Sequence, residues 1–299
     1  PMTPTWFKES LNHQPSAHFI DVSGAKIHYL SWFNPGKPGL LFVHGHAAHA
    51  HWWDFIAPGL ATDYSIAAID LSGSGDSDHR KLYSTEIFAE EIAAVIAAEG
   101  WDDVSLVAHS FGGVMARSTT FLYPGLIQTM VLVDSVVNGR ARSAKAVEKP
   151  IRSPRRSRAT QERIYKTISE GQRRFRLKPP QPCENAYIID HISRHSLKET
   201  QKGYTFKLDR KLFAKLKASP NLPNGLKMVQ AFMGTKGFVI GEDSHFFTGI
   251  NTTNLETLQS LRPGKYLQVI SGARHHVFLD KPQSFIRSLK TLLSSNPAV

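Results

Sequence analysis

Ser110 is the residue of this chain best placed to act as a nucleophile. A mostly apolar run at 104–108 leads into it, small residues follow, and residues 114–117 continue at helical spacing. This pattern predicts a strand, a sharp turn and a helix, with the serine hydroxyl exposed at the turn. Gly112, two residues later, lets backbone pass closely because it has no Cβ. A serine presented in this way could attack a carbonyl carbon if the fold supplied a base and an oxyanion hole.

Donors for an oxyanion hole are expected beside this serine. Residues 40–46 are typical of a buried strand that ends at a glycine turn. A backbone N–H just after such a strand can point at a developing oxyanion. We therefore expect the N–H groups of His46 and Phe111 to form the hole.

A base is expected near the carboxyl end of the chain. Residues 266–282 run from a strand into a loop, and a proline at 282 opens a helix. His275, seven positions before that proline, is the favoured general base. Its neighbour His276 is the alternative, or else a residue that lines the pocket.

With these motifs the chain resembles the α/β-hydrolase family, and the resemblance covers nearly all of it. The segment at 108–112 departs from the family pattern Gly-x-Ser-x-Gly only at Ala108. Residues 70–77 match the family's Asp-x-x-Gly-x-Gly-x-Ser segment, in which the aspartate holds the turn. The resemblance implies that Ser110 is the nucleophile and that a histidine and an acid complete a catalytic triad.

The order of elements favours the same fold. Strands are expected near 17–22, 26–33, 39–43, 65–70, 104–108, 129–134, 236–241 and 265–270. Helices are expected near 51–61, 85–99, 111–123, 252–261 and 282–294. This alternation predicts an α/β fold, with a mostly parallel eight-stranded sheet and helices on both faces.

The acid of the triad has more than one candidate. The family places it most often after the seventh strand, three residues beyond a glycine, and Ser244 occupies that position here. Asp243 and Glu242 fall one and two positions short. Some family members carry the acid just after the sixth strand, where this chain has Asp134. We favour Asp134 and keep Asp243 and Glu242 as alternatives; each preserves the order serine, acid, histidine.

The hundred residues after the sixth strand are expected to cover the active site. In this fold an insertion at that point is a cap, so 137–224 is assigned to a helical cap between core segments 1–136 and 225–299. Within it, 159–175 and 185–196 are each expected to form one helix.

Positive charge is concentrated in the first part of this predicted cap. The chain has a net charge of +11, and residues 140–178 hold 14 Lys and Arg against three acidic residues. No nucleic-acid recognition motif accompanies the run. A solvated surface segment, or one that steers anionic substrates toward a pocket, is the better interpretation.

Cysteine content, apolar runs and histidine spacing exclude several further classes of protein. One cysteine, Cys183, excludes an internal disulfide and suits a reducing compartment. No apolar run is long enough for a membrane span and no signal core is recognised, so a cytoplasmic location is expected. His44, His46, His49 and His51 do not have the spacing of a zinc site. We expect no metal, cofactor, nucleic-acid or membrane partner; a homodimer is possible.

The sequence thus predicts a serine hydrolase that cleaves a small carboxylic ester, thioester or lactone through an acyl-enzyme on Ser110. Hydrolysis of a carbon–carbon bond with the same triad is the first alternative. A non-catalytic receptor for a small ligand on the same fold is the second. Epoxide hydrolase and haloalkane dehalogenase chemistry are disfavoured, because those enzymes use aspartate where this chain has Ser110.

Overall fold

The computed structural model describes residues 2–138, 162–261 and 266–294, and it contains an eight-stranded sheet. The strands are β1 (Ser16–Val22), β2 (Ala25–Trp32), β3 (Gly39–Val43), β4 (Ser65–Ile69), β5 (Val104–His109), β6 (Thr129–Val133), β9 (Thr235–Gly241) and β10 (Leu267–Ile270). Their order across the sheet is β1-β2-β4-β3-β5-β6-β9-β10. The strands from β4 to β10 are parallel, and β1 and β2 are antiparallel to their neighbours.

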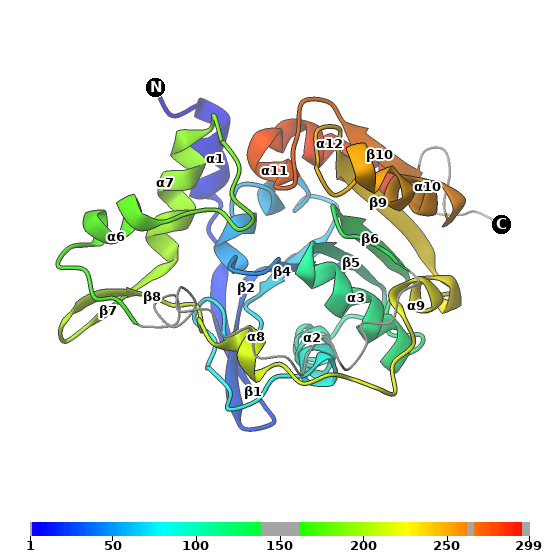
Figure 1. The fold of residues 1–299 in the computed structure, drawn as a ribbon, viewed down its shortest axis with the longest axis horizontal. Helices are drawn as coiled ribbons and strands as arrows, with labels where there is room; N and C mark the ends of the chain where they lie inside the picture. Colours follow the sequence, from blue (N-terminus) through cyan, green and yellow to red (C-terminus); the bar gives the residue numbers. More distant parts are fainter. Residues whose placement is uncertain (1, 139–161, 262–265, 295–299) are drawn as a thin grey trace.

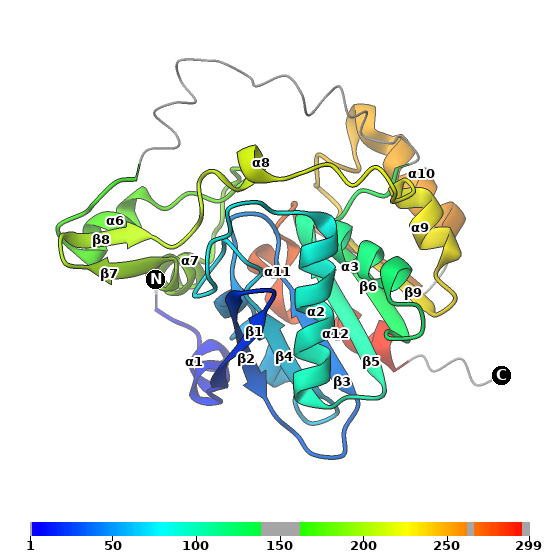
Figure 2. The same ribbon diagram turned by 90° about the horizontal axis from the view of Figure 1, so that it is seen from below.

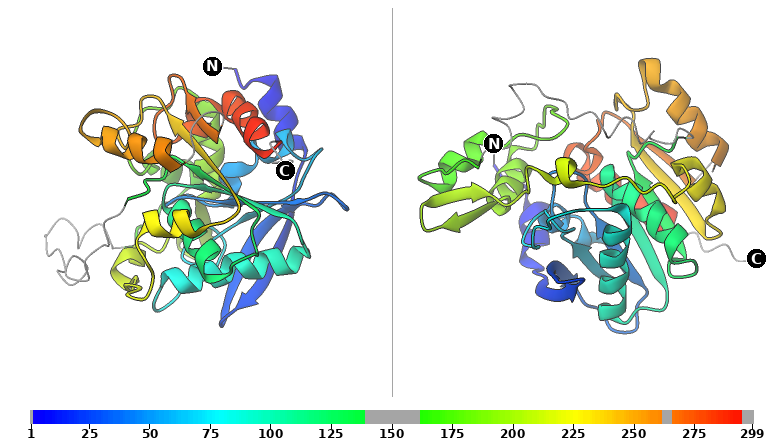
Figure 3. Two further views of the ribbon diagram at one scale, coloured as in Figure 1. Left: turned by 90° about the vertical axis from the view of Figure 1, so that its right-hand side faces the viewer. Right: turned by 60° about the horizontal axis from the view of Figure 1, so that its bottom comes forward.

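Both faces of the sheet are buried, so its central strands are almost wholly apolar. Along β3, Leu40 and Phe42 belong to one hydrophobic cluster, and Leu41 and Val43 to the other. This alternation follows from the twofold period of a strand. The helices on the first face are α1 (Thr5–Asn12), the 3-10 helix η1 (Ala50–Trp53), α11 (Val277–Asp280) and α12 (Pro282–Leu293). Those on the second face are α2 (Thr85–Glu99), α3 (Phe111–Leu122) and α10 (Thr252–Leu261) (Figures 1 and 3).

All eight predicted strands are present, and four of the five predicted core helices match within a residue. The exception is 51–61, which forms two short 3-10 helices, η1 and η2 (Ala57–Gly59), instead of one α-helix. Pro58 has no backbone N–H to donate, and Gly59 has a low helix propensity, so a continuous α-helix is disfavoured there. Residue 265, the predicted start of the last strand, lies outside the described residues, and β10 begins at Leu267.

The insertion between β6 and β9 is more mixed than the predicted helical cap. Its elements within the described residues are α6 (Ile168–Arg174), α7 (Ala186–His195), β7 (Leu197–Thr200), β8 (Gly203–Phe206), α8 (Leu212–Lys215) and α9 (Gly225–Ala231). The expectation for 185–196 is confirmed by α7. The single helix over 159–175 is wrong: residues 159–161 lie outside the described part, and Tyr165 pairs with Tyr204. Thr167 then caps α6 by accepting a hydrogen bond from the N–H of Glu170. The hairpin β7–β8 was not expected.

The insertion lies over the carboxyl end of the sheet. Figure 2 shows α8 and the segment that leads to α9 crossing this end, while α6, α7 and the hairpin gather to one side. Phe213 of α8 contacts two residues at that edge, with ring centroids 4.3 Å from His46 and 5.6 Å from Phe111. None of the helices described combines the length and the apolar character needed to cross a bilayer.

Candidate active site

Ser110 lies in the strained turn between β5 and α3. Its φ is 52° and its ψ is −115°, a backbone conformation that non-glycine residues rarely adopt. Three hydrogen bonds hold it there. Its N–H donates to the carbonyl of Val133 at 2.9 Å, and its own carbonyl accepts from the N–H of Gly113 at 3.0 Å and from Ser135 Oγ at 2.8 Å. Strain that is fixed in this way is typical of functional sites.

Two glycines allow the turn to approach the end of β3. A Cβ added to Gly112 would lie 2.5 Å from the carbonyl oxygen of His44, so this position has no room for a side chain. A Cβ added to Gly45 would lie 3.3 Å from Ser110 Cβ. The loop after β3 is therefore packed directly against the serine.

His275 and Asp134 are hydrogen-bonded to each other in the interior. The distance from His275 Nδ1 to Asp134 Oδ1 is 2.7 Å, and both side chains are almost fully buried. Among the described residues, His275 Nε2 has no hydrogen-bond partner. With Nδ1 donating to the carboxylate, Nε2 carries the lone pair, which is the tautomer a general base needs. The ring of His275 also lies 4.8 Å from that of His109, the residue before Ser110.

The structure brings Asp134 to the histidine and leaves the other two acids elsewhere. Asp134 Oδ1 also accepts from Ser244 Oγ at 2.7 Å, and Oδ2 accepts from the N–H of Gly241 at 2.9 Å. Glu242 is exposed and accepts from Ser271 Oγ instead. Asp243 is exposed as well, and no described hydrogen bond links it to His275. Ser244 thus occupies the family's more common acid position and donates to the acid at the alternative one.

The two expected oxyanion donors lie on either side of this turn. Phe111 begins α3, and His46 follows Gly45 in the loop after β3. Neither N–H takes part in a described hydrogen bond, so both are available to a ligand. His44 holds the loop: its Nδ1–H donates to the carbonyl of Gly45 at 2.7 Å, and its Nε2 accepts from the N–H of Leu71 at 3.1 Å.

His276 is buried but serves a different purpose from its neighbour. Its Nε2 donates to the carbonyl of Pro179 at 3.1 Å, and its N–H donates to Gln181 Oε1 at 3.0 Å. Burial and then the proximity of His275 lower the pKa of His276 to about 3, so it remains neutral. It therefore ties the loop after β10 to the insertion. His109, missed by sequence reasoning, donates through Nε2 to the carbonyl of His275 at 3.0 Å and fixes that same loop.

Asp70, another conspicuous acid, is structural. Its carboxylate accepts from His28 Nδ1 and from the N–H groups of Ala50 and Asp76. A Cβ on Gly75 would overlap the carboxylate, which explains the glycine in the Asp-x-x-Gly-x-Gly segment. Burial of the carboxylate opposes its ionisation, but the hydrogen bond and the charge of His28 keep the Asp70 pKa below its ordinary value.

One further cluster carries the donor types of a metal site. Asp54 Oδ2 accepts from His51 Nδ1 and from His191 Nε2, both at 2.8 Å, and the ring of His195 stacks on that of His51 at 3.8 Å. The four side chains could present donor atoms within 4.8 Å of one another. Their hydrogen bonds already give them a structural role, because they join η1 of the core to α7 of the insertion.

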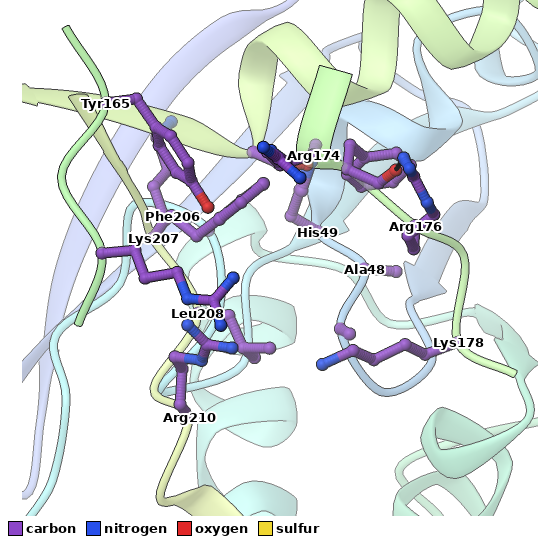
Figure 4. A pocket seen from close by; sticks show the side chains of 15 residues that line it. Ala48, His49, Tyr165, Arg174, Arg176, Lys178, Phe206, Lys207, Leu208 and Arg210 are labelled. Carbon is purple, nitrogen blue, oxygen red and sulfur yellow. Dashed lines mark hydrogen bonds between the residues drawn. The ribbon is translucent and has the colours of Figure 1, made fainter. Parts of the chain in front are cut away.

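A cavity of about 360 Å³ adjoins the oxyanion loop. Ala47 and Ala48, directly after His46, form one wall, and the insertion forms most of the rest (Figure 4). Aromatic rings from Tyr165, Phe175 and Phe206 contribute apolar surface. The cavity is large enough for a small organic ligand.

Comparison with known proteins agrees with the fold. Residues 38–182 match the model of the alpha/beta hydrolase fold family. A serine hydrolase-like protein of Danio rerio is 24% identical over 261 residues, which cover 83% of this chain and 79% of the relative. A putative esterase/lipase of Haemophilus influenzae is 25% identical, over 87% of this chain and 84% of the relative. Human epoxide hydrolase 4 is 26% identical over 118 residues, so the match spans only 33% of that protein.

Solved structures show the same architecture. E-2-(acetamidomethylene)succinate hydrolase superposes with a TM-score of 0.73 at 18% identity, covering 94% of this chain and 100% of the other. The thioesterase domain from the curacin biosynthetic pathway gives 0.71 at 20% identity, covering 91% and 98%. The fold, with Ser110 in its strained turn and the buried pair His275 and Asp134, is that of an α/β-hydrolase enzyme. The fold is therefore that of the α/β-hydrolases, and the family model matches just under half of the chain.

Proposed function

We propose that this chain is a serine hydrolase that cleaves a small carboxylic ester, thioester or lactone. The observation that supports it best is His275, which bonds through Nδ1 to Asp134, has no partner on Nε2 among the described residues, and has its ring centroid 4.8 Å from that of His109, the residue before the strained Ser110. Ser110 would attack the carbonyl carbon while His275 Nε2 takes the hydroxyl proton. The N–H groups of His46 and Phe111 would bind the oxyanion.

The rest of the cycle needs only water. When the tetrahedral intermediate collapses, the bond to the leaving alkoxide or thiolate breaks and His275 returns its proton to that group. A water molecule, deprotonated by the same Nε2, then attacks the acyl carbon and releases the carboxylic acid and Ser110. Asp134 would hold the histidine in the correct tautomer and stabilise its protonated form. The insertion would act as the cap that closes the substrate site, within the predicted boundaries 137–224.

The test combines covalent labelling with turnover. A fluorophosphonate should label the native protein, and Ser110→Ala and His275→Ala should abolish labelling. Ser110→Ala should also lower kcat on p-nitrophenyl esters by about 10⁴-fold or more, with an unchanged circular dichroism spectrum. Labelling without turnover of any ester, lactone or vinylogous diketone would favour the receptor; turnover of the diketone alone would favour carbon–carbon hydrolysis.

A further inference from the structure

The cavity beside the oxyanion loop is lined by an unusual number of positive charges. Six of its lining residues are cationic, and none is acidic. They are Arg163, Arg174, Arg176, Lys178, Lys207 and Arg210. They come from separate segments of the insertion, and Figure 4 shows several of them arranged around one space. Such a concentration is unfavourable in the empty protein, because like charges repel one another.

Three of these cations have no ionic partner among the described residues, whereas a fourth has one. Lys207 forms a salt bridge with Asp76 at 2.7 Å. Arg163, Arg174 and Lys178 form no salt bridge with any described residue. Burial, followed by the charge of Arg210, lowers the pKa of Lys178 below its ordinary value. The cavity is therefore strongly positive before a ligand binds.

A buried polar atom at the cavity also lacks a partner. His49 lines the cavity and is 3% exposed. Its Nε2 bonds to Ser196 Oγ at 2.9 Å, whereas its Nδ1 has no hydrogen-bond partner in the described structure. Because Nε2 carries the proton that it donates to Ser196 Oγ, Nδ1 is an acceptor, and a hydrogen-bond donor on the ligand, such as the P–OH group of a singly ionised phosphate monoester, would satisfy it.

The cavity lies within reach of the serine. Gly45 packs against Ser110, and Ala47, two residues later, is part of the cavity wall. Because consecutive Cα atoms are about 3.8 Å apart, Ala47 lies at most about 8 Å from Gly45, so the near wall of the cavity is close to the serine. One small ligand can therefore place a carbonyl at the serine and its other end in the cavity.

We propose that this cavity binds a phosphate group carried by the substrate, at the end of the ligand opposite the scissile carbonyl. Guanidinium groups form paired, charge-assisted hydrogen bonds with phosphate oxygens, and the lysines add point charges. The aromatic rings of Tyr165, Phe175 and Phe206 accommodate the organic part of the ligand between the two ends. The phosphate is bound and not cleaved. This inference rests on the proposed ester hydrolysis and narrows its substrate class to phosphorylated esters.

Turnover of matched esters tests the preference. Two phosphorylated aryl esters are compared, one with the phosphate on the alcohol part and one with it on the acyl part, each against its methyl-ether analogue. We expect at least one phosphorylated ester to exceed its neutral analogue by about 30-fold or more in kcat/KM. Equal values for both pairs would overturn the proposal while leaving ester hydrolysis intact.

Matched variants separate a bound phosphate from general attraction. Arg174→Gln should reduce the preference by at least about tenfold, since it removes charge-assisted hydrogen bonds. Arg174→Lys, which keeps the charge but loses the planar fork, should give an intermediate loss. Arg173→Gln changes the net charge equally, but Arg173 does not line the cavity, so the preference should change by less than about twofold. If Arg173→Gln and Arg174→Gln reduced the preference for the phosphorylated ester equally, the preference would come only from long-range electrostatic attraction of the substrate, and the proposed phosphate site would be refuted.

Direct binding makes failure of this inference distinguishable from failure of the proposed hydrolysis. Calorimetric titration of Ser110→Ala protein with phenyl phosphate should give saturable binding, which Arg174→Gln weakens by at least about tenfold. Benzyl alcohol should not bind measurably. Saturable binding in a protein that hydrolyses no ester would support the anion site and overturn the hydrolysis. Ester hydrolysis without phenyl phosphate binding would do the reverse.

Discussion

Replacing Asp134 by asparagine keeps the shape of the side chain but cannot preserve all three of its hydrogen bonds. The carboxylate accepts from His275, Ser244 and the N–H of Gly241. An asparagine has one oxygen and one NH₂ group, so one end of the amide must meet a donor. If the NH₂ group faces His275, the ring must accept at Nδ1 and carry its proton on Nε2. If it faces Gly241, two N–H groups oppose each other in the interior.

The first arrangement abolishes the base, since a protonated Nε2 cannot take the serine proton, and both remove the charge that stabilises the imidazolium. We therefore expect Asp134→Asn to lower kcat by about 10³–10⁴-fold. Ser244→Ala removes one donor to the carboxylate but keeps the bond to His275, so a loss of about tenfold or less is expected. Asp243→Asn alters an exposed side chain and should cost less.

All three variants are measured on one p-nitrophenyl ester from pH 6 to 8, with fluorophosphonate titration of active sites and thermal melts to show that each is folded. A large loss of kcat in Asp243→Asn together with a small loss in Asp134→Asn would refute the assignment of Asp134 as the acid of the triad. Near-normal activity of a well-folded Asp134→Asn enzyme would also show that a buried carboxylate bonded to His275 is dispensable.

Two further predictions concern stability. Gly112→Ala places a methyl group 2.5 Å from the carbonyl oxygen of His44. We therefore expect the free energy of unfolding to fall by about 1–3 kcal/mol and kcat to fall as well. Unchanged values of both would show that the loop after β3 moves freely to make room for the methyl group. The bonds from His191 and His51 lower the pKa of Asp54 from 3.8 to about 2 despite its burial. That stability is present above pH 4 and is lost as the pH falls toward 2, so Asp54→Asn should cost about 2 kcal/mol at pH 5 and less at pH 3 in denaturant titrations. A cost that does not change with pH would show that the ionised carboxylate is not responsible.

The core of this fold is readable from sequence because its strands are buried on both faces and end in distinctive turns. The run before Ser110 has to be apolar, and Gly112 has to lack a side chain where β3 approaches. Helices such as α2 start at a capping serine, Ser84, and end at a glycine in the left-handed conformation, Gly100. These are local signals, and they specify the elements that hold the serine and the histidine.

The insertion was harder to predict because its structure depends on contacts distant in sequence. The expected helix over 159–175 is interrupted where Tyr165 pairs with Tyr204, a partner about forty residues away. Thr167 can then cap a shorter helix. The hairpin β7–β8 is only four residues long on each strand, and its alternation is too short to distinguish it from a loop. The basic run drew attention to 140–178, of which 140–161 lie outside the described residues.

Dependence on contacts distant in sequence also explains why the positive charge of this chain could be located from the sequence but its role could not be predicted. A count along the sequence places the positive charge before residue 179, whereas the cavity combines Arg174 and Lys178 with Lys207 and Arg210, which lie some thirty residues further on. The fold of the insertion brings these groups together, and its packing beside the loop after β3 places the cavity near Ser110. A run of charge in sequence is compatible with a solvated surface. Cations that converge from separate segments on one cavity are what a site for an anion requires.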